Sequence, residues 1–229
     1  FLAEDGEEAE HLLHRVGKVV VADEGAHLEI FFDGHGDEDI VGLRHEGHAL
    51  GDAVLRGQLG DILAVQPHRA TALAVDALVA AQRGSWTADI APMVAQLRAQ
   101  QFSEANGWTP EHPAYGGWGM GGAIRRPPDA GHVDLSMTRF VLEALRASGV
   151  DGSDPAMTRA RVFLERSQNH DGGFFFSPVM QALNKAGQSA EGFVSYGTPT
   201  ADGVLALRAS GVPDSDDRIV RGIAWLDRN

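Results

Sequence analysis

The chain has 229 residues, 43% of them hydrophobic and 22% charged, so it is long enough to bury a sizeable core. Its formal net charge of −13 excludes the basic surface that nucleic-acid binding needs and disfavours an anionic membrane surface. It contains no cysteine, which excludes disulfides, thiolate metal sites and cysteine nucleophiles, and it has no apolar run near the ~20 residues that span a bilayer.

The first 68 residues form an irregular N-terminal segment in this prediction. Residues 7–21 have the pattern of a helix, residues 27–32 alternate like a short strand, and residues 49–65 fit a second helix. Glycines and acids between residues 33 and 39 indicate an exposed excursion. The segment is compatible with a decorated helical hairpin, although no repeat establishes one.

An internal repeat organises the rest of the chain. The string Ala-Leu-Arg-Ala-Ser-Gly-Val at residues 144–150 recurs at residues 206–212, a shift of 62 residues. With the same shift Thr138 falls on Thr200, and a weaker upstream copy places Thr71 at the equivalent position. A period of this length is typical of stacked supersecondary units. We therefore predict three helical hairpins, at about residues 69–101, 133–168 and 198–229.

Each hairpin has recognisable helix ends. The first helix of the middle copy runs over residues 135–147 and stops at Gly149, a residue suited to a left-handed cap. Asp154 and Pro155 then open the second helix. In the last copy the string Asp-Ser-Asp-Asp at residues 214–217 takes this place, so we interpret its acids as capping groups rather than as a catalytic motif.

Two glycine-rich loops carry a family resemblance. Residues 168–174 read Gln-Asn-His-Asp-Gly-Gly-Phe, which resembles the QW motif (Q-x3-G-x-W) of squalene and oxidosqualene cyclases, with Phe174 replacing tryptophan. Residues 116–118, Gly-Gly-Trp, supply the second half of an earlier motif after an insertion from Gln100 or Gln101. The chain thus resembles squalene-hopene-cyclase-like proteins with prenyltransferase repeats, clearly over residues 115–229 and weakly over residues 69–114.

This resemblance implies an all-α fold, a partial α/α-toroid in which helical hairpins form a barrel. It also implies that the QW loop is structural, and the residue types agree with this role. Gly172 and Gly173 permit backbone angles closed to other residues, and the Phe174 ring can be buried between repeats. Gln168 is expected to tie a helix end, as the glutamine of that family does.

The resemblance further implies a site where the inner helices begin. These cyclases protonate an alkene or epoxide with the middle acid of a D-x-D-D-T motif. With the threonine aligned on Thr138, the first acid falls on Asp134, the middle position on Ser136 and the last on Met137. Because serine is not a strong acid, Asp134 is the candidate proton donor, oriented or protonated by His132. The alternative is that Asp134 or Ser136 only caps the helix.

Other residues are candidates for binding a ligand. Asp202, two residues after Thr200, is placed either to face a central cavity or to balance the helix dipole. Aromatic rings near the helix openings either line that cavity and stabilise a carbocation or pack in the core. These aromatic candidates are Trp118, Phe175, Phe176 and Tyr196.

Two functions stay open on the sequence alone. One is a terpene-cyclase-like toroid that holds an apolar, isoprenoid-like molecule, with proton-initiated cyclisation and no cofactor. The other is a non-catalytic repeat scaffold that binds a ligand or a protein. No metal site is expected, because residues 45–48 lack the H-E-x-x-H spacing and cysteine is absent. Since three or four hairpins do not close a ring, we expect self-association or flanking repeats.

Overall fold

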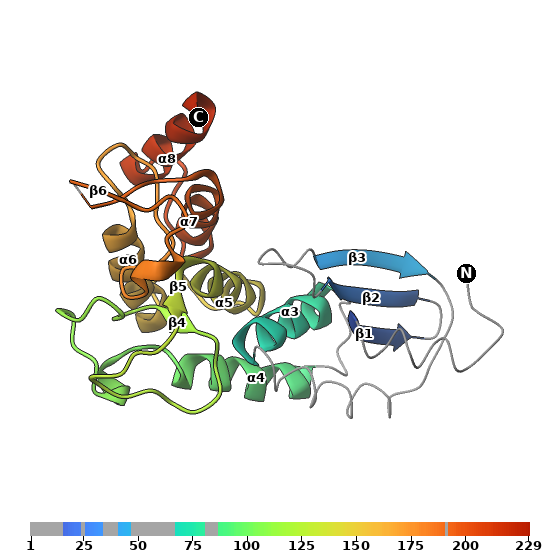
Figure 1. Cartoon of the computed structure of the whole chain (residues 1–229). Helices are drawn as coiled ribbons and strands as arrows, with labels where there is room; N and C mark the ends of the chain where they lie inside the picture. Colours follow the sequence, from blue (N-terminus) through green and yellow to red (C-terminus); the bar gives the residue numbers. More distant parts are fainter. Residues whose placement is uncertain (1–15, 24–25, 34–40, 47–66, 81–86, 191) are drawn as a thin grey trace. The chain divides into compact units, whose positions relative to one another are not determined.

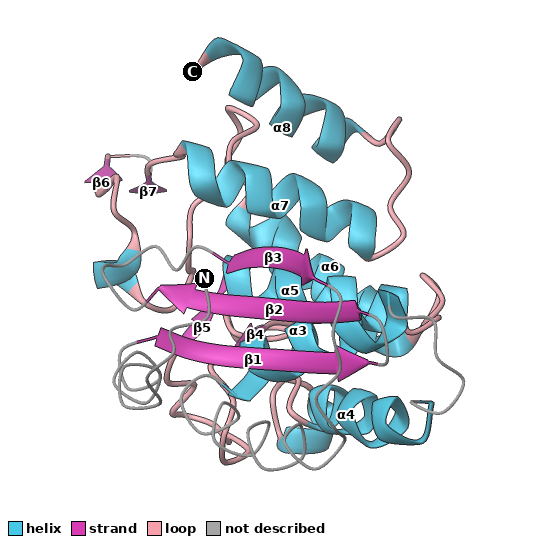
Figure 2. Cartoon of the chain, turned by 90° about the vertical axis from the view of Figure 1, so that its right-hand side faces the viewer, coloured by secondary structure: helices cyan, strands magenta, loops and turns pink. Residues whose placement is uncertain are grey.

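The computed structural model describes residues 16–23, 26–33, 41–46, 67–80, 87–190 and 192–229. The chain divides into two compact units, residues 1–65 and residues 66–229, which are considered separately. The first unit contains a three-stranded antiparallel sheet, magenta in Figure 2, in the order β1-β2-β3. Its strands are β1 (Val16–Asp23), β2 (Ala26–Asp33) and β3 (Val41–Glu46).

This sheet corrects the expectation of an all-α chain. The helix predicted over residues 7–21 is wrong from residue 16 onward, where the chain forms β1 and Val21 pairs with Leu28 of β2. The run of three valines that ends at Val21 explains the error, since β-branched side chains favour a pleated strand. The strand expected at residues 27–32 is confirmed within β2. The helix predicted at residues 49–65 lies outside the described residues.

The second unit is mostly helical. Helices α3, α5 and α7 are the first helices of three consecutive hairpins, and Figure 1 shows them following one another, α3 against α5 and α5 against α7. The second helices, α4, α6 and α8, each contact the first helix of their own hairpin. The helices are α3 (Pro67–Ala80), α4 (Thr87–Ala99), α5 (Leu135–Ala147), α6 (Pro155–Ser167), α7 (Gly197–Ala209) and α8 (Asp217–Arg228).

The connections between hairpins are long and contain little regular structure. Two short antiparallel strand pairs and two 3-10 turns lie within them. The strands are β4 (Trp118–Gly119) with β5 (Val133–Asp134), and β6 (Gln188–Ser189) with β7 (Gly192–Phe193). The pair β4–β5 matters for the site, because it fixes the chain just before α5 begins.

Helix ends follow the sequence signals. Gly149 has φ +89°, as a left-handed cap requires, and α5 spans the residues predicted for it. The Asp154 side chain accepts a hydrogen bond from Ala156 N and caps α6. The Asp216 side chain accepts from Arg218 N in the same way and caps α8. The acid string at residues 214–217 therefore contains a helix cap, as expected.

Two glutamines connect consecutive hairpins. Gln101 Nε2 donates to Gly116 O at 3.0 Å within its own loop and to Ala156 O of α6 at 2.8 Å. Gln168 Nε2 makes the equivalent bonds, one within its own loop at 3.0 Å and one to Arg218 O of α8 at 2.8 Å. Both glutamines thus lie after one hairpin and hold the start of the second helix of the next hairpin.

Two threonines join the same loops to the first helices. Trp118 N donates to Thr138 Oγ1 at 3.1 Å, and Thr138 Oγ1 donates to Asp134 O at 2.8 Å. One repeat later, Phe174 N donates to Thr200 Oγ1 at 3.0 Å, and that hydroxyl donates to the carbonyl four residues before it at 2.8 Å. Each hydroxyl therefore satisfies a buried loop N–H and a helix carbonyl together.

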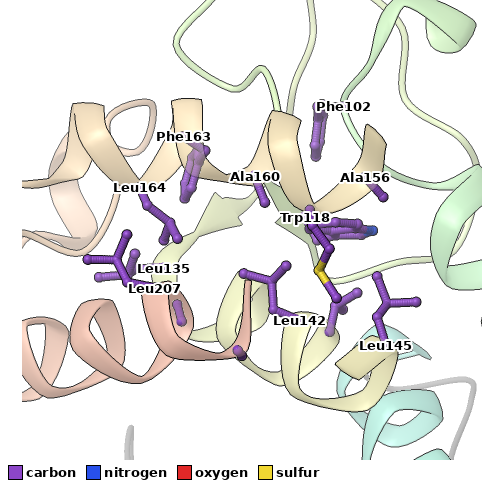
Figure 3. Close-up of a cluster of buried hydrophobic side chains, with 14 of the residues drawn as sticks. Phe102, Trp118, Leu135, Leu142, Leu145, Ala156, Ala160, Phe163, Leu164 and Leu207 are labelled. Carbon is purple, nitrogen blue, oxygen red and sulfur yellow. The ribbon is translucent and has the colours of Figure 1, made fainter. Parts of the chain in front are cut away.

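The core lies between α5, α6 and α7, as the close-up in Figure 3 shows. Trp118 is fully buried there, and its Nε1 donates to Leu97 O at 2.7 Å, so the indole has its polar atom satisfied. Apolar side chains from all three helices belong to the same buried cluster. They are Leu135, Leu142, Leu145, Ala156, Ala160, Phe163, Leu164 and Leu207.

Replacing Gly116 by alanine tests how tightly the first loop is packed. Gly116 has φ +87°, and a Cβ there would lie 2.0 Å from Arg159 O. We expect Gly116→Ala to lower the free energy of unfolding by about 3 kcal/mol, measured by urea denaturation. Gly122→Ala is the matched control, because Gly122 also has φ +87° but nothing within 4 Å, and it should cost about 1 kcal/mol. Equal losses would show that the backbone angle alone is responsible.

Candidate functional site

Asp134 opens α5 with both carboxylate oxygens engaged. Its Oδ1 accepts from Met137 N at 2.8 Å, which makes it the N-cap of the helix, and a hydrogen bond joins its Oδ2 to His132 Nε2. The Asp134 side chain is only 1% exposed. The two residues that the sequence paired as candidates are therefore in direct contact, and Asp134 also has the capping role that was weighed against catalysis.

The surroundings hold this pair in place. In the β4–β5 ladder Asp134 pairs with Trp118, and Leu135 N donates to Phe176 O at 2.9 Å. The Phe176 ring also lies edge-on to His132, with the ring centroids 6.4 Å apart. His132 keeps 29% of its side chain exposed, so the pair meets solvent through the imidazole and not through the carboxylate.

Ser136 binds a carboxylate from the neighbouring first helix. Its hydroxyl donates to the side chain of Asp202 on α7, and Asp202 Oδ1 is also ion-paired with Arg139 Nε at 2.9 Å. Burial raises the pKa of Asp202, while Arg139 and then Ser136 act in the opposite direction. The middle position of the cyclase motif therefore has a carboxyl group beside it, although the group belongs to another helix.

More charged side chains continue from Asp202 across α5 to α3. Arg139 Nη1 lies 3.3 Å from Glu143 Oε1, and burial raises the pKa of Glu143. Burial, reinforced by Glu143, also raises the pKa of Asp76 on α3, to about 7. The charged cluster, as we call it, consists of Asp76, Ser136, Arg139, Glu143 and Asp202.

Burial is the largest influence on the acids of the charged cluster. The pKa values of its three carboxyl groups are all raised, chiefly by burial, and Arg139 opposes the rise at each of them. The guanidinium carbon of Arg139 lies 4.2 Å, and that of Arg69 4.9 Å, from the centroid of the Phe140 ring. Burial therefore shifts all three acids toward their protonated form, and for Asp76 it raises the pKa to about 7.

Sequence reasoning missed most of this cluster. It named Ser136 and Asp202 but not Asp76, Arg139 or Glu143. A signal was present, because Asp76 and Glu143 are separated by the same interval as Thr71 and Thr138 and so occupy equivalent repeat positions. Acids repeated on first helices that pack side by side are brought close together.

The aromatic candidates fall into two groups. Trp118 is part of the core, and Phe175 is buried against Phe193, with ring centroids 5.1 Å apart. Phe176 lies beside His132, as described above. Burial raises the pKa of Tyr196, and the charges of Asp134 and Asp202 add to this rise.

A small pocket opens beside His132. Its volume is about 50 Å³, and His68, Gln100, Met120, Arg125 and His132 are among its lining residues. Burial lowers the pKa of His68, whose Nδ1 lies 2.6 Å from Gly119 O. Because pockets for drug-sized ligands have volumes of about 300–1,000 Å³, this pocket does not hold an isoprenoid chain.

Metal and membrane sites were also sought in the part of the chain that the structure describes. No group of three or more His, Cys, Asp or Glu side chains there could hold a metal ion. None of the helices described is both long enough and apolar enough to cross a membrane. His45 lies in β3, whereas His48 falls outside the described residues.

Comparison with known proteins bears on the same region. Residues 130–229, which contain Asp134, α5 to α8 and Asp202, match the family model of the squalene-hopene cyclase C-terminal domain. The predicted resemblance to squalene-hopene cyclases is confirmed. The squalene-hopene cyclase of Bradyrhizobium diazoefficiens is 33% identical to the chain over 137 residues. The alignment covers 60% of this chain but 17% of that cyclase, and no solved structure matches significantly.

Asp76→Asn tests whether the carboxyl group of Asp76 on α3 is destabilised by burial. A raised pKa means that the folded state prefers the protonated carboxyl, so Asp76 destabilises the fold increasingly as pH rises from about 4 through about 7. The asparagine variant should therefore be more stable than the wild type at pH 8, by on the order of 1–2 kcal/mol after solvent screening, with little gain at pH 4. Urea unfolding at both pH values measures this. Asp214→Asn, an exposed acid on α8's leading loop, is the control and should show no such gain.

Proposed function

We propose that this chain is a terpene-cyclase-like α/α-toroid repeat protein that holds an isoprenoid-like molecule against its first helices and protonates one of its double bonds. One observation carries the proposal: two buried carboxyl groups, Asp134 and Asp202, lie near the N-termini of the consecutive first helices α5 and α7. Ser136, in the first turn of α5, interacts with Asp202. Both lie in the region that matches the cyclase domain.

The chemistry suits such a site. An alkene is a very weak base, so its protonation needs a carboxylic acid kept away from water. Burial raises the pKa of Asp202 and so favours its protonated form. His132 and Asp134 belong to the same site, where the imidazole is partly open to solvent and its hydrogen bond orients the carboxylate.

Aromatic rings supply the second requirement, a surface that tolerates positive charge. Tyr196, whose pKa responds to the charges of Asp134 and Asp202, and Phe176, which lies against His132, are the rings that we propose stabilise a carbocation. Trp118 and Phe175 are both buried, so we propose that they support the binding surface and do not contact the ligand directly. No cofactor or metal is needed for this reaction class.

The toroid part of the proposal requires more hairpins than three. Leu226 on α8 is 36% exposed and Val220 is 50% exposed. One repeat earlier, Leu164 occupies the position equivalent to Leu226 and is fully buried in the core. A further hairpin, from a second copy of the chain or from flanking repeats, would cover this edge and complete a larger cavity.

Product analysis tests the proposal. We expect the 229-residue protein, incubated with squalene and with shorter polyprenyl substrates, to form cyclised products detectable by gas chromatography and mass spectrometry. Because a general acid contributes about 10²–10⁴-fold, the double variant Asp134→Asn, Asp202→Asn should lose turnover by about that factor. A wild-type protein that returns every substrate unchanged would contradict the proposal.

A second candidate function is a non-catalytic scaffold that binds a ligand or a protein. The charged cluster favours it, since an apolar molecule laid against Arg139, Glu143 and Asp202 would remove charged groups from water at considerable cost. In that case squalene-sized ligands would be bound and recovered unchanged, or would not bind at all. The same product analysis therefore separates the two functions.

A further inference from the structure

Two carboxyl groups compete for the role of acid in the proposed site, and the structure distinguishes them. We infer that Asp202, and not Asp134, is the proton donor, reaching from α7 to the position that Ser136 occupies on α5. This inference rests on the proposed function and specifies its acid. The sequence alone pointed to Asp134, because that residue matches the first acid of the cyclase motif.

Asp134 is committed to holding the helix. Its two oxygens are taken by Met137 N and by His132 Nε2, and its side chain is 1% exposed. A carboxylate that caps an N-terminus is most favourable when ionised, because the N–H donor and the helix dipole both stabilise negative charge. Both oxygens of Asp134 are therefore engaged in holding the start of α5.

Asp202, in contrast, does not cap a helix. It lies within α7, after the first turn, and the N-cap of that helix is Tyr196. The partners of its carboxyl group are side chains, the hydroxyl of Ser136 and Arg139 Nε at 2.9 Å. The side chain of Asp202 keeps 10% exposure, compared with 1% for Asp134.

The environment of Asp202 supports both stages of a proton transfer. Burial favours the protonated form before the reaction, as its raised pKa indicates. Arg139 then stabilises the carboxylate that remains after the proton has left, which strengthens the acid in the transition state. Burial also raises the pKa values of Glu143 and Asp76, which lie in the same charged cluster.

The step itself balances simply. The O–H bond of Asp202 breaks, and the π electron pair of a substrate double bond forms a C–H bond with that proton. The adjacent carbon becomes a carbocation, and Asp202 is left as a carboxylate paired with Arg139. After ring closure the cation loses a proton to water or is captured by water, and water returns a proton to Asp202.

Matched amide substitutions test this assignment with squalene as the probe. We expect Asp202→Asn to reduce cyclised product about 10²–10⁴-fold, a larger loss than Asp134→Asn causes through the α5 cap and the His132 hydrogen bond. Asp214→Asn, at an exposed acid before α8, is the control and should leave the product yield unchanged. Ser136→Asp added to Asp202→Asn puts a carboxyl back beside the same place from α5, and should recover at least about tenfold over Asp202→Asn alone. A purely structural role of Asp202 would not give this rescue. Urea unfolding of each variant verifies that it is folded.

The outcomes separate the two proposals. Loss of product in Asp134→Asn with retention in Asp202→Asn would overturn the assignment of the acid while leaving the proposed function intact. Equal loss in both variants without rescue by Ser136→Asp would overturn it as well. A wild-type protein with no cyclised product would reject the proposed function, and this inference with it.

Discussion

The arrangement of the second unit depends on one hydrogen-bonding constraint, which occurs in two repeats. Each glycine-rich loop buries an aromatic residue. The backbone N–H of that residue is buried with it and cannot donate to water. In each copy the N–H donates to a threonine hydroxyl on the next first helix, Thr138 for Trp118 and Thr200 for Phe174. Because an unsatisfied buried N–H costs about 1–3 kcal/mol, this bond fixes the loop against the helix and so sets where that helix begins.

The position of the acids follows from that constraint. Thr138 Oγ1 also donates to Asp134 O, so the same hydroxyl that satisfies the loop holds the first residue of the site. Successive first helices then pack side by side, and Asp202 of α7 meets Ser136 and Arg139 of α5. The charged cluster is thus a product of helix packing. The pKa values of its carboxyl groups are raised because burial outweighs the opposing charge of Arg139 at each of them and of Arg69 at Asp202.

Much of this fold could be predicted, because the repeat supplies its own internal check. Two copies of one string located α5 to α8, and capping chemistry located their ends at Gly149, Asp154 and Asp216. The N-terminal segment offered no second copy, and its run of valines was mistaken for a helical face where β1 forms. The contact between Ser136 and Asp202 was also out of reach, since no local pattern states which faces of two helices meet.

In a repeat architecture, a functional group can be supplied from a different repeat and still occupy the same place in the structure. Position 136 and position 202 belong to different hairpins, yet their side chains meet because neighbouring first helices share one surface. A motif read along α5 alone has serine, not an acid, at position 136. The neighbouring helix α7 nevertheless supplies the carboxyl group of Asp202 beside that position. Serine suits this exchange, since its hydroxyl is small and donates to a carboxylate. The absence of the middle acid from the motif is therefore weak evidence against proton chemistry, and the composition of the shared surface is the stronger criterion.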